Sequence, residues 1–154
     1  MHIFEENIKQ LGIEIPDMPA PLANYLPYKV SDSVVYVAGQ GPVKNGELVY
    51  KGKVGKDISI DDGIKAAELC CINIIAALKK SINGDWNRLE SFLKLGGFVN
   101  CNDNFQDQPK IINGASDLLV SIFGNQGKHS RFAVGSNSLP MNISVEIDAI
   151  IKIK

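Results

Sequence analysis

Two charged side chains in the last third of the sequence have the chemistry to bind and convert a small carboxylate. Arg131 follows the glycine-containing stretch 124–129 at the start of a predicted strand, and its planar guanidinium can pair with a carboxylate through two parallel hydrogen bonds. Glu146 lies between Val145 and Ile147 in an apolar strand. Burial in a pocket would raise its pKa and suit it to proton transfer or to positioning water. For both residues, the plain alternative is a solvated surface charge.

Three further side chains are weaker candidates for a site. His129 could titrate near neutral pH, but it stands beside a glycine-rich turn and we expect it to be exposed. Tyr25 lies in a proline-rich loop, which could hold its ring over a pocket or pack it structurally. Asn113 falls within a predicted helix, where surface exposure is the default. No nucleophile elbow, Walker loop or HExxH motif is present, and residues 39–42 are too short for a dinucleotide fingerprint.

The length and composition predict one globular domain covering residues 1–154. The chain has 16 basic and 17 acidic residues and a formal charge of −1, a balance that disfavours nucleic acid as a partner. Three cysteines lack the spacing of a zinc site, so we expect no bound metal, and their odd number without a signal peptide favours the cytoplasm. The sequence contains no run of 18 apolar residues, so it predicts no membrane span.

Apolar spacing predicts the elements that must position these side chains. Helices are expected at 3–11, 59–82 and 109–123, and strands at 34–38, 47–50, 91–101 and 143–150. We expect strand 47–50 to pair with strand 34–38, and Gly96-Gly97 to mark a bulge or a close backbone approach. Cys70 and Cys71 fall inside the middle helix and are expected to fill the core. The order predicts an α+β domain with two helices on one face of a mixed sheet.

The spacing around the two charged residues resembles a family signature. From Arg131, Val134 follows three residues later, Leu139-Pro140 eight and nine residues later, and then Val145-Glu146-Ile147-Asp148. This pattern resembles the C-terminal signature of the Rid family, which is YjgF-type and also labelled endoribonuclease L-PSP. Tyr25 followed by residues 35–40 is similar to the N-terminal pattern of that family. The resemblance covers roughly residues 20–153, and residues 1–19 form an N-terminal extension.

The resemblance implies a chorismate-mutase-like fold that assembles as a homotrimer around an inner barrel of sheets, with one cleft at each subunit interface. Well-described members hydrolyse enamines and imines derived from amino acids to 2-keto acids and ammonia, and no cofactor is implied. By position, Arg131 would bind the substrate carboxylate and Glu146 would orient water or relay protons. Tyr25 would line the cleft, Gly39 would offer backbone contacts, and Asn113 is the nearest counterpart of an asparagine in the cleft.

The sequence also departs from the family pattern, which keeps other functions open. Ala38 stands where the family often has serine, Ala133 stands where it often has a small residue or a thiol, and the stretch 103–114 looks longer. These departures indicate a divergent branch. The first expectation is an imine deaminase, and the alternative is a non-catalytic or regulatory trimer that binds a small carboxylate. RNA cleavage or translation inhibition is a third possibility, which the charge balance disfavours.

Overall fold

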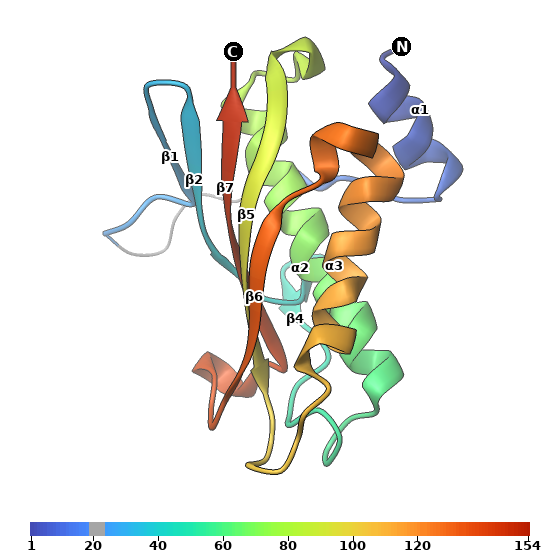
Figure 1. The fold of residues 1–154 in the computed structure, drawn as a ribbon, viewed down its shortest axis with the longest axis vertical. Helices are drawn as coiled ribbons and strands as arrows, with labels where there is room; N and C mark the ends of the chain where they lie inside the picture. The colour runs from blue at the N-terminus through green and yellow to red at the C-terminus, as the bar shows by residue number, and fades with distance from the viewer. Residues whose placement is uncertain (19–23) are drawn as a thin grey trace.

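A five-stranded sheet carries the fold, and its helices lie on one side of it (Figure 1). The computed structural model describes residues 1–18 and 24–154. The helices are α1 (Ile3–Gln10), α2 (Ile60–Ser81) and α3 (Gln108–Phe123). The strands are β1 (Tyr28–Ser31), β2 (Val34–Gln40), β3 (Val43–Lys44), β4 (Glu47–Leu48), β5 (Leu89–Asn100), β6 (Ser130–Ser136) and β7 (Val145–Ile153). Short 3₁₀ turns lie at Trp86–Arg88, Gly124–Gly127 and Pro140–Asn142.

The sheet is mixed, as the sequence predicted. Its order is β1-β2-β7-β5-β6, and every pair is antiparallel except β5 and β6. The parallel pair is joined through α3, because parallel neighbours need a crossover connection. The predicted alternation along β7 is confirmed: Val145, Ile147 and Ala149 are buried on the helix side, and the residues between them point to the other side.

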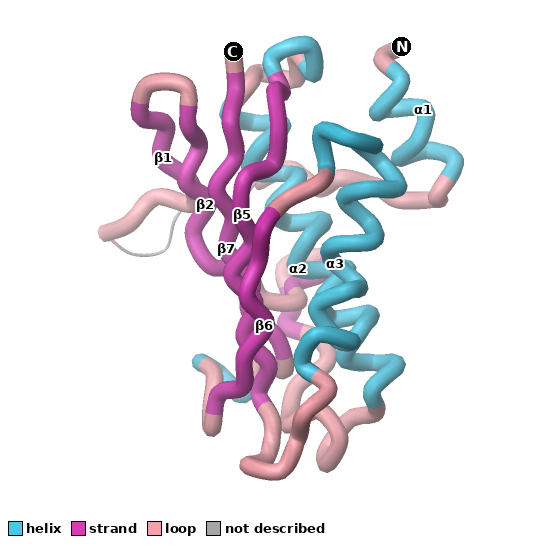
Figure 2. Tube along the Cα trace, in the orientation of Figure 1, coloured by secondary structure: helices cyan, strands magenta, loops and turns pink. Residues whose placement is uncertain are grey.

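The helices α2 and α3 form the layer that covers one face of the sheet (Figure 2). The Ser59 hydroxyl accepts a hydrogen bond of 3.1 Å from the Asp62 amide and begins α2 as expected. Cys70 and Cys71 are fully buried, which confirms that they fill the core, and burial raises the pKa of both thiols. Pro109 stands in the first turn of α3, and Gly124 ends it at a φ of 58°.

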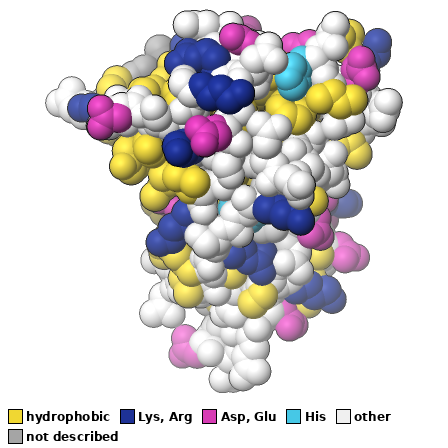
Figure 3. All heavy atoms as spheres, turned by 45° about the horizontal axis from the view of Figure 1, so that its top comes forward, with side chains coloured by type: hydrophobic (Ala, Val, Ile, Leu, Met, Phe, Trp, Pro, Cys, Tyr) yellow, Lys and Arg dark blue, Asp and Glu magenta, His cyan; other side chains and the backbone are white. Residues whose placement is uncertain are grey.

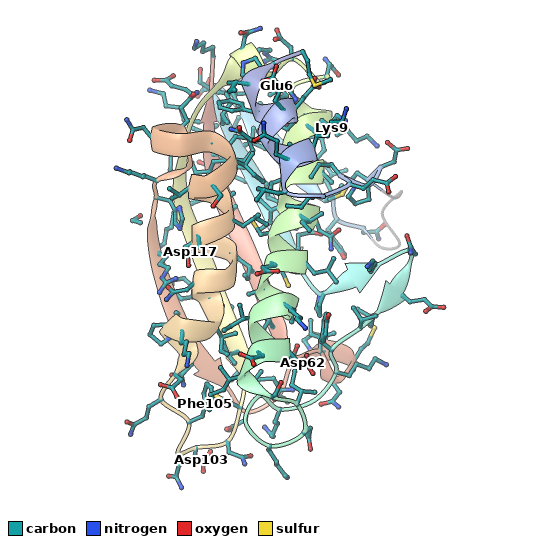
Figure 4. All side chains as sticks on the ribbon, turned by 90° about the vertical axis from the view of Figure 1, so that its right-hand side faces the viewer. Glu6, Lys9, Asp62, Asp103, Phe105 and Asp117 are labelled. Carbon is teal, nitrogen blue, oxygen red and sulfur yellow. The ribbon has the colours of Figure 1, made fainter. Side chains whose placement is uncertain are left out.

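Helix α1 packs at the end of this layer, beside α3 (Figure 4). The Asn7 side-chain amide donates a 2.7 Å hydrogen bond to the Ile122 carbonyl. The Phe4 ring contacts Trp86 and Phe123 edge-on, with centroids 6.4 and 5.0 Å apart. These contacts attach the first turns of the chain to the main core.

The predicted pairing of strand 47–50 with strand 34–38 is wrong. Strand β4 pairs with β3, while β2 is flanked by β1 and β7. Asn45 and Gly46 both have positive φ values, 52° and 78°, the geometry of a two-residue hairpin turn. Such a turn pairs the residues that directly flank it, so β4 finds its partner locally.

Of the two alternatives expected at Gly96-Gly97, the structure shows a close approach of neighbouring side chains and no bulge. A Cβ at Gly97 would lie 2.8 Å from the Ile112 side chain of α3, and one at Gly96 would collide with an Asp148 carboxylate oxygen. The register shifts of β5 against β7 fall earlier, between Leu89 and Lys94. The glycines therefore let side chains approach from both sides of β5.

Two further expectations concern the rest of the chain. The proline-rich loop around Tyr25 includes residues 19–23, which lie outside the described residues. Across residues 1–18 and 24–154, the helices are all too short or too polar to cross a lipid bilayer.

Candidate functional site

Arg131 lies at the start of β6, on the side of the sheet that faces the helices. It is in register with the buried Leu95 of β5. One guanidinium nitrogen, Nη1, donates a hydrogen bond of 3.1 Å to the Ser116 hydroxyl of α3, and Nη2 donates one of 3.2 Å to the Pro109 carbonyl. Arginine has five N–H donors, so the other donors remain for a ligand.

His129 belongs to the same cluster, and the expectation that it is exposed is wrong. Its ring is partly buried, with Nε2 lying 2.8 Å from the Ser116 hydroxyl and Nδ1 lying 2.7 Å from the Gly127 carbonyl. The residue is drawn in because the chain between α3 and β6 folds back as a short 3₁₀ turn. Ser116, His129 and Arg131 thus form one hydrogen-bonded group, which we call the arginine cluster.

The partners of Arg131 are all neutral in this cluster. Within the part of the chain that the structure describes, the one ion pair joins Lys152 and Glu90 at 3.4 Å. Arg131 therefore has no carboxylate within 4.0 Å among the described residues, although its side chain is partly buried. A half-buried cation held by neutral groups is suited to receive an anion.

Glu146 lies on β7, on the opposite face of the sheet. Its carboxylate lies against the backbone of β2, where a Cβ at Gly39 would be 2.8 Å from Oε2. Burial raises the pKa of Glu146, and the neighbouring Asp148 carboxylate raises it further. The register between β2 and β7 shifts between Val37 and Gln40, so Gly39 lies at an irregularity that lets Glu146 fold over the strand.

Arg131 and Glu146 therefore do not share a pocket within one chain. Arg131 is on the side of Leu95, which is buried under the helices. Glu146 pairs with Phe98, three residues further along β5 and on the uncovered face. The sequence predicted the strand of Glu146 and a strand start near Arg131, but it could not give the faces on which the two side chains lie.

The other two predicted residues lie at different places. Tyr25 is 62% exposed and is not among the residues that line the nearby hollow of about 440 Å³, although its chain neighbours Asn24 and Leu26 are. Asn113 is exposed and lines a hollow of about 430 Å³ on the outer side of α2 and α3, together with Asp117. Asp117 points outward from α3 in Figure 4. Ser116, and not Asn113, is the α3 side chain that bonds Arg131.

The face around Glu146 carries aromatic and charged side chains, and none of α1, α2 and α3 covers it (Figure 2). Phe98 and Phe132 meet edge-on there with centroids 5.3 Å apart, and the Lys94 ammonium lies 5.5 Å from the Phe132 centroid. Tyr36 is 49% exposed on the same face. We call this surface the open face.

No group of three or more His, Cys, Asp or Glu residues in residues 1–18 and 24–154 is placed to hold a metal ion.

Comparison with known proteins identifies the family. Residues 5–150 match the YjgF/chorismate mutase-like family. The chain belongs to this family. It is 35% identical over 148 residues to Protein TCP17 of Trypanosoma cruzi, covering 96% of this chain and 92% of that protein. The Rid signature at the two ends of the sequence therefore predicted the family correctly.

Solved structures agree with this assignment. The protein Atu1372 of Agrobacterium tumefaciens, whose function is unknown, is 42% identical with a TM-score of 0.93, over 99% of this chain and 93% of that one. TdcF of E. coli, solved with bound serine, has the same fold at 20% identity and a TM-score of 0.59, over 87% and 91% of the two chains. The closer likeness to a protein of unknown function places this chain in a divergent branch, as Ala38 and Ala133 indicated.

Proposed function

We propose that this protein hydrolyses imines derived from amino acids to 2-keto acids and ammonia, at a site shared between two copies of the chain. Arg131 of one copy binds the substrate carboxylate. Glu146 of a neighbouring copy accepts a proton from the attacking water and transfers it to the substrate nitrogen. In line with the family resemblance, the assembly we propose is a homotrimer.

The observation that carries the proposal is the state of Arg131. Its guanidinium is partly buried, is held by the Ser116 hydroxyl and the Pro109 carbonyl, and has no carboxylate partner among the described residues. A carboxylate that binds the remaining N–H groups would form charge-assisted hydrogen bonds, which are about twice as strong as neutral ones. A small 2-imino acid carries such a carboxylate next to its reactive carbon.

The reaction needs no covalent bond between the protein and its substrate. Water adds to the imine carbon as a C–O bond forms, and the electron pair of the C=N bond moves to nitrogen, which takes up a proton. The resulting amino alcohol then breaks its C–N bond, releases ammonia and leaves the keto group. Glu146 supports both steps, because a carboxyl with a raised pKa can accept a proton from water and return it to nitrogen. Fixing the substrate by its carboxylate supplies the orientation.

The two faces of the sheet support a site that is shared between copies. Arg131 and Glu146 lie on opposite sides of it, so a substrate of a few atoms cannot touch both in one chain. On the open face, the exposed Tyr36 and the Phe98–Phe132 pair are aromatic side chains of the kind that a second protein copy covers. A closed ring would bring the Arg131 edge of one copy to the Glu146 face of the next.

The direct test is an assay in which a dehydratase generates 2-aminoacrylate from serine and keto-acid formation is followed. We expect the wild type to accelerate pyruvate release and Arg131→Ala to abolish this acceleration. Arg88 is the other arginine of the chain; its side chain makes one 3.5 Å hydrogen bond to the Lys154 carbonyl. Arg88→Ala is therefore the matched control and should keep full activity. A wild-type protein that gives no acceleration would refute the proposed reaction.

Mixing inactive variants tests the sharing of the site. Arg131→Ala and Glu146→Gln should each be inactive alone. After the two are unfolded and refolded together in equal amounts, about one quarter of the sites would combine an intact Arg131 with an intact Glu146. Activity that does not return in the mixture, although each variant refolds and assembles, would show that both residues are needed from the same copy.

A second candidate is a protein that binds the carboxylate without turning it over. Ala38 stands where the family often has serine, and Ala133 stands where it often has a small residue or a thiol, so this chain has fewer groups for chemistry. In this case pyruvate would bind, Arg131→Ala would abolish the binding, and the dehydratase assay would show no acceleration by the wild type.

Nucleic acid is a poor partner for this surface. The formal charge is −1, and on the face shown in Figure 3 basic and acidic side chains lie interspersed. A phosphate backbone is usually held by a basic stripe or patch. We expect no binding of single-stranded RNA at low salt.

A further inference from the structure

We propose that Ser116 and His129 are positioning residues that hold the Arg131 guanidinium ready for a carboxylate. The inference rests on the proposed role of Arg131 and extends it to two residues that do not themselves touch the ligand. Neither belongs to the signature from which the family was expected.

The hydrogen bonds of the arginine cluster have one consistent direction. The Gly127 carbonyl can only accept, so the Nδ1 of His129, 2.7 Å away, must carry a proton. In a neutral imidazole, Nε2 is then the acceptor, and the Ser116 hydroxyl 2.8 Å away donates to it. The hydroxyl oxygen is thereby turned to accept from Nη1 of Arg131 at 3.1 Å. The tautomer of His129 thus sets the orientation of Ser116, and Ser116 sets that of Arg131.

The cluster holds a planar group at two points. Nη1 is bound to Ser116 and Nη2 to the Pro109 carbonyl, and both partners belong to α3, which is packed against the sheet. Two anchors on the two terminal nitrogens fix the plane of the guanidinium. The conformational freedom of this long side chain is then lost on folding and not on ligand binding, which favours affinity.

The chemistry of Ser116 argues against a purely local role. A serine inside a helix commonly bonds a backbone carbonyl of the preceding turn. Here the hydroxyl is instead engaged by two side chains that come from outside the helix. Its removal would leave the hydrogen bonds of the α3 backbone in place and would take away one anchor of Arg131.

Pyruvate binding, followed by NMR titration of the ¹⁵N-labelled wild type and variants, tests the inference. Ser116→Ala should weaken pyruvate binding roughly tenfold, the factor that corresponds to the loss of one ordinary hydrogen bond. Ser116→Thr keeps the hydroxyl and should retain most of the affinity. Ser121 lies on the same helix, is exposed and lines the outer hollow, so Ser121→Ala is the matched control and should bind like the wild type.

His129 is tested by a conservative pair of variants and by its tautomer. His129→Gln offers an amide oxygen to the Ser116 hydroxyl and should bind pyruvate nearly as well as the wild type. His129→Leu offers no acceptor and should match Ser116→Ala. The chain has two histidines, so the ring ¹⁵N signals lost in His129→Gln identify His129. At a pH where the ring is neutral, these signals should report a proton on Nδ1.

The outcomes separate this inference from the proposed function. If Arg131→Ala binds pyruvate as the wild type does, the proposed role of Arg131 fails. Thermal midpoints and amide spectra first establish that Ser116→Ala and His129→Leu are folded. If these two variants then bind pyruvate normally while Arg131→Ala does not bind it, only the positioning role fails. A neutral His129 with its proton on Nε2 would also overturn it.

Discussion

Gly39→Ala should separate activity from stability, because the three atoms nearest to the added methyl group all belong to the Glu146 side chain. The built Cβ lies 2.8 Å from Oε2, 3.0 Å from Cδ and 3.2 Å from Cγ of Glu146. Ordinary contacts begin near 3.4 Å, so the carboxylate must move by about 0.6 Å or more. The φ of Gly39 is not positive, and alanine therefore brings no backbone strain.

The cost in stability should be small. Glu146 is partly exposed and its carboxylate is the end of a flexible side chain, so it can rotate toward water. We expect the free energy of unfolding to fall by no more than about 1 kcal/mol, less than the loss typical of overpacking in a rigid core. Chemical denaturation of the wild type and Gly39→Ala measures this difference.

The cost in activity should be large. A misplaced general base or acid forfeits a contribution that is typically about 10²-fold or more, so keto-acid release in the dehydratase assay should fall by about 100-fold. The double variant Gly39→Ala/Glu146→Gln should be no worse than Glu146→Gln alone, because both changes act on the same group. A variant that keeps wild-type activity, or a double variant whose losses simply add, would refute the reasoning.

Three further changes test other parts of the structure. The pKa of Glu146 is raised, so the folded state binds this proton more tightly than the unfolded state does. The free energy of unfolding should therefore fall as pH rises from about 4.3, the ordinary glutamate pKa, to the raised pKa. Urea titrations at several pH values should show this decline for the wild type and not for Glu146→Gln, and the same decline in both proteins would contradict the assignment. Gly97→Ala places a Cβ 2.8 Å from Ile112 in the interface between β5 and α3 and should destabilise the fold by about 1–3 kcal/mol; an unchanged denaturation midpoint would refute that packing. Cys70 and Cys71 are fully buried with raised pKa values, so both should react with a thiol reagent only after unfolding, and fast labelling of the native protein at these positions would argue against their burial.

Periodicity predicted the elements well where each depends on its own residues. The stripe of α2 and the alternation of β7 follow from the apolar pattern alone, and Ser59 and Gly124 mark helix ends by local chemistry. The predicted partner of β4 was wrong because strand pairing depends on the turn geometry at Asn45-Gly46 and on which strands already flank β2. These are relations between segments, and a single segment does not contain them.

The candidate site shows the same limit. The residue types of Arg131 and Glu146 predicted carboxylate binding and proton transfer, but their faces depend on the registers of β6 and β7 with β5. Ser116 had no signal, because a serine inside a helix is ordinary and Arg131 is fifteen residues away. His129 stood two residues before Arg131, where an extended chain places side chains on the same side, and this spacing could have joined the two.

The position of β7 has a consequence for how the chain reaches its native state during synthesis. This strand lies in the middle of the sheet between β2 and β5, yet it comes after both along the chain, and its partners in β2 are more than a hundred positions earlier. Until residues 145–153 leave the ribosome, β2 and β5 lack the strand that lies between them, so one backbone edge of each stays unpaired. A nascent chain arrested before this point would expose those edges to chaperones and to other chains.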